Sequence, residues 1–177
     1  MTHLHPTNDY NVLYSIHTWL WDALEAYEKP PWLPTFTIIE GVPETEATLP
    51  AVSLFDLPGA QSSPYQGRVA EEGVAVMKSY GMLEASCWTS RGALWNGAEC
   101  WRMQLNTLTA WVRDAVRKSP TLIVYDALTD YNNPVATPYK VNVTAANVVQ
   151  AAADENPDIM RQRILIPYNW HGRAFTG

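Results

Sequence analysis

The chain has 177 residues, of which 47% are hydrophobic, and carries a net charge of −6. This length allows one domain with a sizeable core, and the composition excludes a disordered chain. The acidic balance excludes tight, nonspecific adhesion to nucleic acid, which requires clustered Lys and Arg. We therefore expect a single globular domain over residues 1–177.

The first predicted element is an amphipathic helix from Asn8 to about Lys29. Apolar residues recur there at helical spacing, and Asn8 or Asp9 is available as an N-cap. Pro30 and Pro31 then end the helix, because proline cannot continue it. Residues 1–7 before this helix are expected to be a flexible terminus.

Short β-like runs follow the first helix. They lie at 35–41, 50–57, 73–80 and 82–90, and Pro- and Gly-rich turns separate them. This pattern indicates an antiparallel meander with one long, mobile loop near 58–68.

A second helix is predicted over 97–118. Asn96 and Glu99 resemble a capping box before it, and Arg117 and Lys118 suit its last turn. Its apolar stripe comprises Trp101, Leu105, Leu108, Val112 and Ala115. The helix ends before Pro120.

The C-terminal third of the chain is more mixed. Strands are expected at 121–128 and 139–143, and a short helix capped by Thr144 at 144–157. Within this part, residues 129–158 look like an elaboration of a smaller fold.

The closing segment 160–170 alternates with period two, which is typical of a half-buried strand. One face carries Met160, Ile164, Ile166, Tyr168 and Trp170, and the other carries Arg161, Arg163, Pro167 and Asn169. Because Pro167 cannot donate to a ladder, we expect the strand to lie at a sheet edge or to leave the sheet there. Taken together, the elements predict an α+β fold, in which an antiparallel or mixed β-sheet carries two main α-helices packed on one face.

The sequence contains no strong chemical motif. His3 and His5 have no Cys or carboxylate at ligand spacing, and no glycine-rich phosphate motif is present, so we predict no catalytic, cofactor-binding or metal site. Two cysteines are too few for a disulfide framework, which favours a reducing compartment. No signal peptide or membrane-length apolar window is found, and we expect a soluble, non-exported protein.

Eight tryptophans are an unusually high number for a chain of this length. Trp19, Trp101, Trp111 and Tyr125 occupy core-type positions. Trp32, Trp88, Trp95 and Trp170 lie at the ends of elements or in loops, where an interface is nearly as good an explanation as local packing. The absence of chemistry beside this supply of aromatics favours an assembly protein.

The order of elements resembles the tail-terminator family of long-tailed bacteriophages, of the phage lambda type. The resemblance is carried by the opening helix with its Pro-bounded strands ("PPWLPTFTIIEG", "LPAVSLFDLPG"), the second helix "CWRMQLNTLTAWVRDAV" before "TLIVYDAL", and the closing "QRILIPYNWH". It implies a structural virion protein without enzymatic activity. Such a subunit forms a ring, expected to be a homohexamer, that caps the tail tube and stops its polymerisation.

The same resemblance implies the partners and the location. These are other copies of the chain, the tail-tube protein and a neck or connector protein, at the head-proximal end of the tail in the virion, after assembly in the host cytoplasm. DNA would pass through the lumen without specific binding, and no membrane is involved. The candidate assembly interface comprises Trp88, Arg161, Arg163, Trp170, Arg173 and Phe175.

Three alternatives remain open at this point. A neck or head-completion connector subunit would share the ring geometry but contact the portal side. A small intracellular hydrolase would use Cys87 or Cys100 with His171 and an Asp such as Asp126, although cysteines beside core-type residues are more often structural. A small-ligand binder would line its pocket with the surplus tryptophans.

Overall fold

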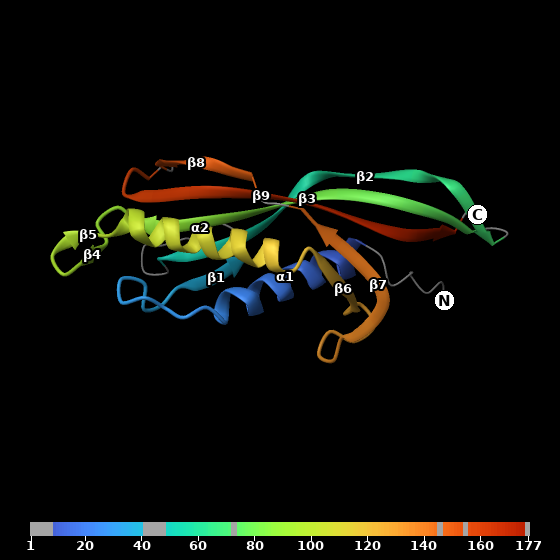
Figure 1. Ribbon diagram of the computed structural model, residues 1–177, viewed down its shortest axis with the longest axis horizontal. Coiled ribbons are helices and arrows are strands. Elements are labelled where there is room, and N and C mark those ends of the chain that lie inside the picture. The colour runs from blue at the N-terminus through green and yellow to red at the C-terminus, as the bar shows by residue number, and fades with distance from the viewer. Residues whose placement is uncertain (1–8, 41–48, 72–73, 145–146, 154–155, 176–177) are drawn as a thin grey trace.

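The chain forms two long helices and a seven-stranded sheet in this computed structural model, which describes residues 9–40, 49–71, 74–144, 147–153 and 156–175. The elements are α1 (Asp9–Glu25), β1 (Thr37–Glu40), β2 (Ala51–Glu71), β3 (Val74–Ser90), β4 (Leu94–Trp95), β5 (Ala98–Glu99), α2 (Trp101–Lys118), β6 (Thr121–Asp126), β7 (Val135–Val143), β8 (Asn147–Ala153) and β9 (Ile159–Phe175). Both helices lie on the same face of the sheet (Figure 1).

The strands of the main sheet follow the order β1-β2-β3-β9-β7-β6, and β8 pairs with β9. β1 is parallel to β2, and the remaining pairs are antiparallel. The sheet is therefore mixed, and β4 and β5 form a separate two-stranded hairpin. The α+β class expected from the sequence, with two helices on one face, is confirmed.

Helix α1 confirms the first predicted helix but ends earlier, at Glu25 instead of about Lys29. Its sheet-facing stripe is fully buried and consists of Val12, Ile16, Leu20 and Leu24. Asn8, one of the two candidate N-caps, lies outside the described residues.

Polar side chains fix the first half of α1 to the end of β6. The Asn11 amide donates to Asp126 Oδ1 at 3.0 Å and accepts from the Ala127 backbone N–H at 3.0 Å. One turn further on, Ser15 Oγ accepts from the Tyr125 backbone N–H at 2.8 Å. These contacts join segments more than a hundred residues apart in the sequence.

Helix α2 carries the predicted apolar stripe, and its buried residues include Leu105, Leu108, Val112 and Ala115. The predicted capping box is wrong. Asn96 and Gly97 have positive φ angles of 52° and 79° and lie in the turn of the β4–β5 hairpin, while the N-cap is Cys100, which makes no side-chain cap. Asn-Gly is the strongest short hairpin signal, because a type I′ turn requires positive φ at both positions.

The loop expected at 58–68 is part of β2, which pairs with β3 along most of its length. Its register shifts between Leu57 and Gln61 and again between Pro64 and Val69. Proline and glycine read as turn residues in the sequence, but a ladder accommodates them at such irregularities. The β2–β3 hairpin and the end of β9 extend beyond the helices (Figure 1).

The predicted strands at 73–80 and 82–90 are one continuous strand, β3. Gly81 joins them and is paired with Tyr168 of β9. A Cβ atom at Gly81 would lie 2.3 Å from Cζ of Tyr168. The glycine therefore marks the place where an aromatic ring lies against the backbone, and not a break between strands.

The helix predicted at 144–157 is wrong, because Asn147–Ala153 forms β8. β8 runs antiparallel to β9 and pairs with it between Met160 and Leu165. Alanine-rich sequence has a high helix propensity, but backbone groups of β9 on this side need partners, and tertiary pairing overrides local propensity.

Strand β9 lies in the interior of the sheet, with β3 on one side and β8 and β7 on the other. The expectation that Pro167 places it at an edge is wrong. The Pro167 carbonyl accepts from Thr144 N at 2.9 Å, so its nitrogen faces the same side. There β8 pairs only as far as Leu165 and β7 begins pairing at Tyr168, so no ladder bond is required of Pro167.

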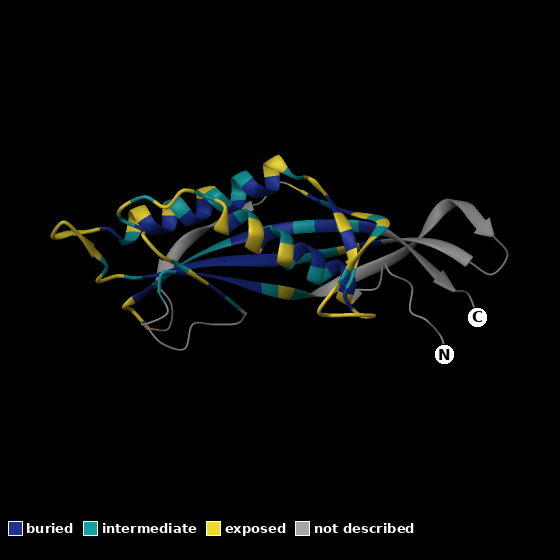
Figure 2. Cartoon of the chain, turned by 90° about the horizontal axis from the view of Figure 1, so that it is seen from below, coloured by how far each residue is buried: buried dark blue, intermediate teal, exposed yellow. Residues whose placement is uncertain are grey.

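The main core lies between the helices and the sheet. Figure 2 shows the buried residues along the inner sides of the helices and strands, and the exposed ones on the β4–β5 hairpin and the β6–β7 connection. From β9 the core receives Ile164, Ile166, Tyr168 and Trp170, as the alternation predicted. A second, smaller cluster of Ala51, Trp88 and Ile159 lies apart from this core.

Candidate assembly surfaces

The predicted interface residues of β9 lie on different faces of the strand. Trp170 is 2% exposed and stacks on Tyr168 with ring centroids 5.7 Å apart, inside the main core. Arg161 and Arg163 point to the opposite face, and their side chains are 26% and 44% exposed. Of the two explanations left open for Trp170, an interface or local packing, its burial supports local packing.

The two arginines converge on one buried carboxylate. Arg161 Nη2 lies 2.6 Å from Oε1 of Glu84, and Arg163 Nη2 lies 2.5 Å from Oε2. Ser86 Oγ donates to Glu84 at 2.6 Å and accepts from Arg161 Nε at 3.0 Å. The glutamate is 1% exposed, and its single negative charge is balanced by arginines of the same chain. Because two arginines contact one carboxylate, the cluster keeps one net positive charge, which the partly exposed arginines present at the surface.

This arrangement lowers the pKa of Glu84. Burial by itself raises the pKa of a carboxyl group, but the hydrogen bonds from Arg163, Ser86 and Arg161 favour the charged form and outweigh burial. Glu84 is consequently ionised at neutral pH and holds both arginines in place.

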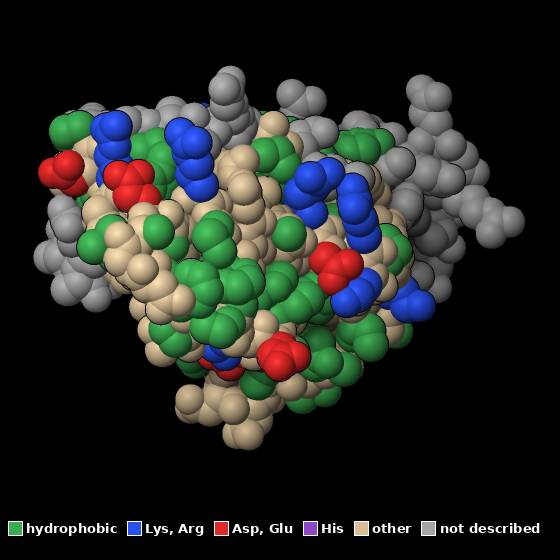
Figure 3. All heavy atoms as spheres, turned by 60° about the vertical axis from the view of Figure 1, so that its left-hand side comes forward, with side chains coloured by type: hydrophobic (Ala, Val, Ile, Leu, Met, Phe, Trp, Pro, Cys, Tyr) green, Lys and Arg blue, Asp and Glu red, His purple; other side chains and the backbone are tan. Residues whose placement is uncertain are grey.

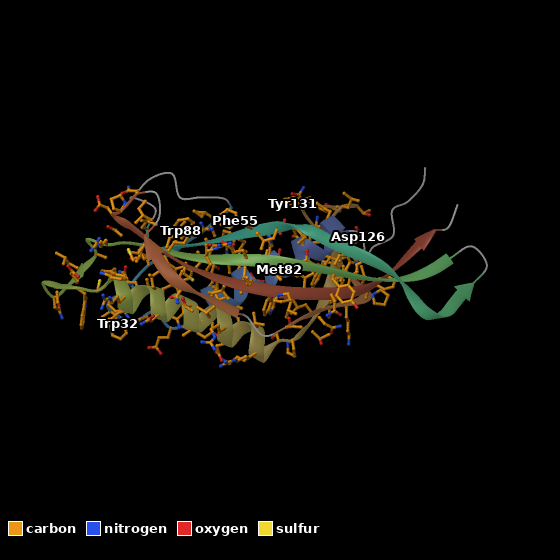
Figure 4. The ribbon with its side chains drawn as sticks, turned by 90° about the horizontal axis from the view of Figure 1, so that it is seen from above. Trp32, Phe55, Met82, Trp88, Asp126 and Tyr131 are labelled. Carbon is orange, nitrogen blue, oxygen red and sulfur yellow. The ribbon has the colours of Figure 1, made fainter. Side chains whose placement is uncertain are left out.

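Trp88 is fully buried beside this cluster. Its Nε1 donates to Ser53 Oγ at 2.6 Å, and the Arg161 guanidinium lies 4.5 Å from its ring centroid and 5.7 Å from that of Phe55. Figure 4 shows Trp88 and Phe55 close together over β2 and β3. Trp88 was a candidate interface residue with local packing as the alternative, and its ring packs in the second core cluster.

Arg173 and Phe175 lie in the last part of β9. Their backbone pairs with Val76 and Val74 of β3, at the end of the sheet that extends beyond the helices. They are therefore remote from Arg161 along the strand, and the six predicted residues do not form one site.

A groove that sequence reasoning missed runs between α1 and the strands β1 and β2. It has a volume of about 760 Å³, and its lining includes Tyr10, His17, Trp21, Asp56 and Tyr131. Tyr10, Trp21 and Tyr131 are 46%, 43% and 65% exposed. Part of the signal was available, because α1 places Tyr10 and Trp21 outside the stripe that the periodicity assigns to the core, whereas Tyr131 comes from the connection between β6 and β7.

A second exposed apolar region lies at the end of the molecule that carries the β4–β5 hairpin (Figure 1). On and beside the β4–β5 hairpin, Leu94, Trp95 and Met103 are 65%, 36% and 38% exposed, and Trp95 contacts Trp32 with centroids 5.7 Å apart. Figure 3, in which this end comes forward, shows hydrophobic side chains gathered among charged ones. Trp95 ends the two-residue strand β4, as expected of a residue at an element end, and it is partly exposed.

For the alternative Cys–His hydrolase, the structure places Cys87 far from His171. Cys87 pairs with Gln162 of β9 and Lys78 pairs with His171, so about 30 Å of strand separates Cys87 from His171 at ~3.3 Å per residue. Burial raises the pKa of Cys87 to about 12, with a hydrogen bond from Thr109 opposing it, and keeps the thiol protonated. Asp126 is engaged with Asn11 and Thr129.

Within the described ranges, no group of three or more His, Cys, Asp or Glu side chains is arranged to hold a metal ion. In the same part of the chain, neither helix is long and apolar enough to cross a membrane.

Comparison with known proteins gives a match among solved structures but not among protein families or curated sequences. No protein-family model and no curated protein matches the sequence. Among solved structures, the fold is similar to a chain of the virion of a native gene transfer agent particle, with a TM-score of 0.50 and 14% identity. The match covers 93% of this chain and 100% of that one, so the two share an overall fold.

Proposed function

We propose that this chain is a structural subunit of a phage-like virion that caps the tail tube as a ring, ends tube polymerisation and presents a joining surface to the neck. The observation that carries the proposal is the fold shared with a virion chain of a gene transfer agent particle over nearly the whole length of both proteins. The similarity includes the entire neighbouring chain, so it concerns a complete fold and not a common motif.

The surfaces of the molecule support an assembly role. A closed ring of identical subunits needs two different contact surfaces on each subunit. The described residues supply exposed aromatic or apolar regions at two separate places, the α1 groove and the β4–β5 hairpin. Exposed aromatic patches of this kind are typical of interfaces.

The chemistry supports a structural and not a catalytic role. The thiol of Cys87 is buried and protonated, and Glu84 is saturated by Arg161, Arg163 and Ser86. The acidic balance of the chain, −6, suits a lumen through which DNA slides without adhering.

The proposal is tested by electron microscopy of the purified protein, alone and mixed with tail tubes of a phage-like particle. We expect rings of one size and electron density for a ring at one end of each tube. Tubes should also stop lengthening when the protein is added during their polymerisation. Rings that bind isolated portal or neck complexes but never tubes would indicate a neck or head-completion subunit and would contradict the capping role.

A truncation that removes residues 171–177 gives a second measurement. Because Arg173 and Phe175 belong to the part of β9 beyond the helices, we expect an intact core, seen as an unchanged circular dichroism spectrum, with weaker ring formation or capping. A truncated protein that forms rings and caps as well as the full chain would remove this segment from the interface.

A further inference from the structure

The two helices of this chain carry opposite charge. α1 contains three acidic residues and no Lys or Arg, whereas α2 contains four basic residues and one acidic residue. Of the acidic side chains, Asp22 lines the α1 groove together with Asp56 of β2, and both are exposed. The groove is therefore aromatic and acidic.

The groove lies on the side of α1 that faces away from α2. Trp19 and Ala23 line a hollow together with Ala115 and Lys118 of α2, so they mark the side toward α2. Successive residues of a helix turn by about 100°, which places Tyr10, His17 and Trp21 on roughly the opposite side from Trp19 and Ala23. That opposite side opens toward β1 and β2.

The basic side of α2 likewise faces away from α1. Trp111 stacks on Tyr27, which follows the end of α1, with ring centroids 5.2 Å apart, and Asp114 accepts from the Tyr27 hydroxyl at 2.5 Å. These residues therefore mark the side of α2 toward the C-terminal end of α1. By the same helical rotation Arg102 and Arg113 lie on the far side, with Arg117 next to them toward solvent. Among the described residues, none forms an ion pair with Arg113 or Arg117.

We propose that the basic side of α2, defined by Arg102, Arg113 and Arg117, docks into the aromatic, acidic groove of α1 in a second copy of this chain. The occupant is a second copy because the complementary surfaces belong to one chain and face in opposite directions. A docked pair then leaves one groove and one basic side unused, so further copies can add by the same head-to-tail contact until a ring closes. Arginine suits this groove, since guanidinium pairs with carboxylates and stacks on Tyr and Trp.

This inference rests on the proposed ring and can be tested separately from capping. One variant carries Asp22→Lys and Asp56→Lys, which makes the groove basic. A second carries Arg113→Glu and Arg117→Glu, which makes the α2 side acidic. A control carries Arg91→Glu and Lys140→Glu, two exposed residues outside both surfaces that change the net charge as much as the second variant does. Sizes are measured by analytical ultracentrifugation, and folding by circular dichroism.

We expect wild type and control to form rings, and each of the two surface variants to associate at least tenfold more weakly. An equimolar mixture of the two surface variants should form rings again, in which the two variants alternate. In such a ring the basic groove of the first variant faces the acidic α2 side of the second, and the acidic groove of the second faces the basic α2 side of the first. A Trp21→Ala variant, which leaves every charge in place, should also weaken ring formation at least tenfold. This provides a second readout if a charge variant does not fold.

The other outcomes separate the two proposals. Surface variants that form rings and cap tubes like wild type would overturn this contact and leave capping intact, as would a mixture that fails to recover. A wild type that stays monomeric at high concentration would overturn the contact and the ring together. Rings that respond to the charge variants as expected, but never bind tubes, would support the contact and overturn the capping role.

Discussion

The two faces of strands β3 and β9 bury their residues with different chemistry. On the helix-covered face, Ile164 and Ile166 meet Leu83 and Ala85 in an apolar core. On the other face, the same strands place Glu84 between two arginines, beside the buried ring of Trp88. The apolar face is stabilised by burial, which is non-directional, whereas the polar face is stable only while each charge keeps its partner. Substitutions on the two faces should therefore differ in size and in pH dependence.

The largest effect is expected on the apolar face. Ile166 is fully buried in the central strand, and Ile166→Ala should lower the free energy of unfolding by about 2–5 kcal/mol through lost transfer energy and a cavity. Urea denaturation measures this loss in the free energy of unfolding. Ile123→Ala is the control, since Ile123 is 47% exposed on β6, and it should cost no more than about 1 kcal/mol. Equal losses would contradict the assignment of the core.

On the polar face, Glu84→Gln keeps the shape but removes the charge that both arginines contact. We expect a loss of about 2–3 kcal/mol in urea denaturation, less than the ~3–5 kcal/mol of a fully buried pair, because both arginines keep contact with water. Lys118→Gln, which breaks the exposed pair with Asp114, serves as control and should cost about 0.5 kcal/mol or less. A Glu84→Gln loss no larger than this control would show that the cluster does not stabilise the fold.

A smaller effect is expected at the close approach between Gly81 and Tyr168. Gly81→Ala places a methyl group against the Tyr168 ring and should cost about 1–3 kcal/mol in thermal or urea unfolding. In a Tyr168→Ala background the same substitution should cost almost nothing, because the clash is gone. The same loss in both backgrounds would mean that the strain arises elsewhere.

The smallest expected effect is a difference between the two faces in how the free energy of unfolding depends on pH. The folded-state pKa of Glu84 lies below its ordinary value of 4.5, so its contribution to stability is present above that value and is lost as pH falls through the folded pKa. Wild type should therefore lose more stability than Glu84→Gln between neutral pH and the range below 4.5, while Ile166→Ala should lose as much as wild type. Urea midpoints measured across this range provide the comparison, and parallel curves for wild type and Glu84→Gln would contradict it.

Some of the candidate surface could be predicted from residue types, and some could not. Arg161 and Arg163 share the face that the alternation assigned to them, and both are partly exposed. The sequence could not reveal that Glu84, 77 and 79 positions earlier, neutralises part of their charge. The same holds for Trp88, whose donor finds Ser53 on a neighbouring strand. By contrast, the exposed aromatic side of α1 was readable from helical spacing once the core stripe had been assigned.

The sequence by itself determined the elements that depend on local periodicity. These are the two amphipathic helices and the face of β9 that carries Ile164 and Ile166, because helical and strand repeats follow from neighbouring residues alone. Only the tertiary structure decided that 58–68 and 147–153 are strands and that Pro167 lies inside a sheet. In each of these places the backbone conformation depends on a partner strand distant in sequence, whose pairing outweighs the local preferences of glycine, alanine and proline.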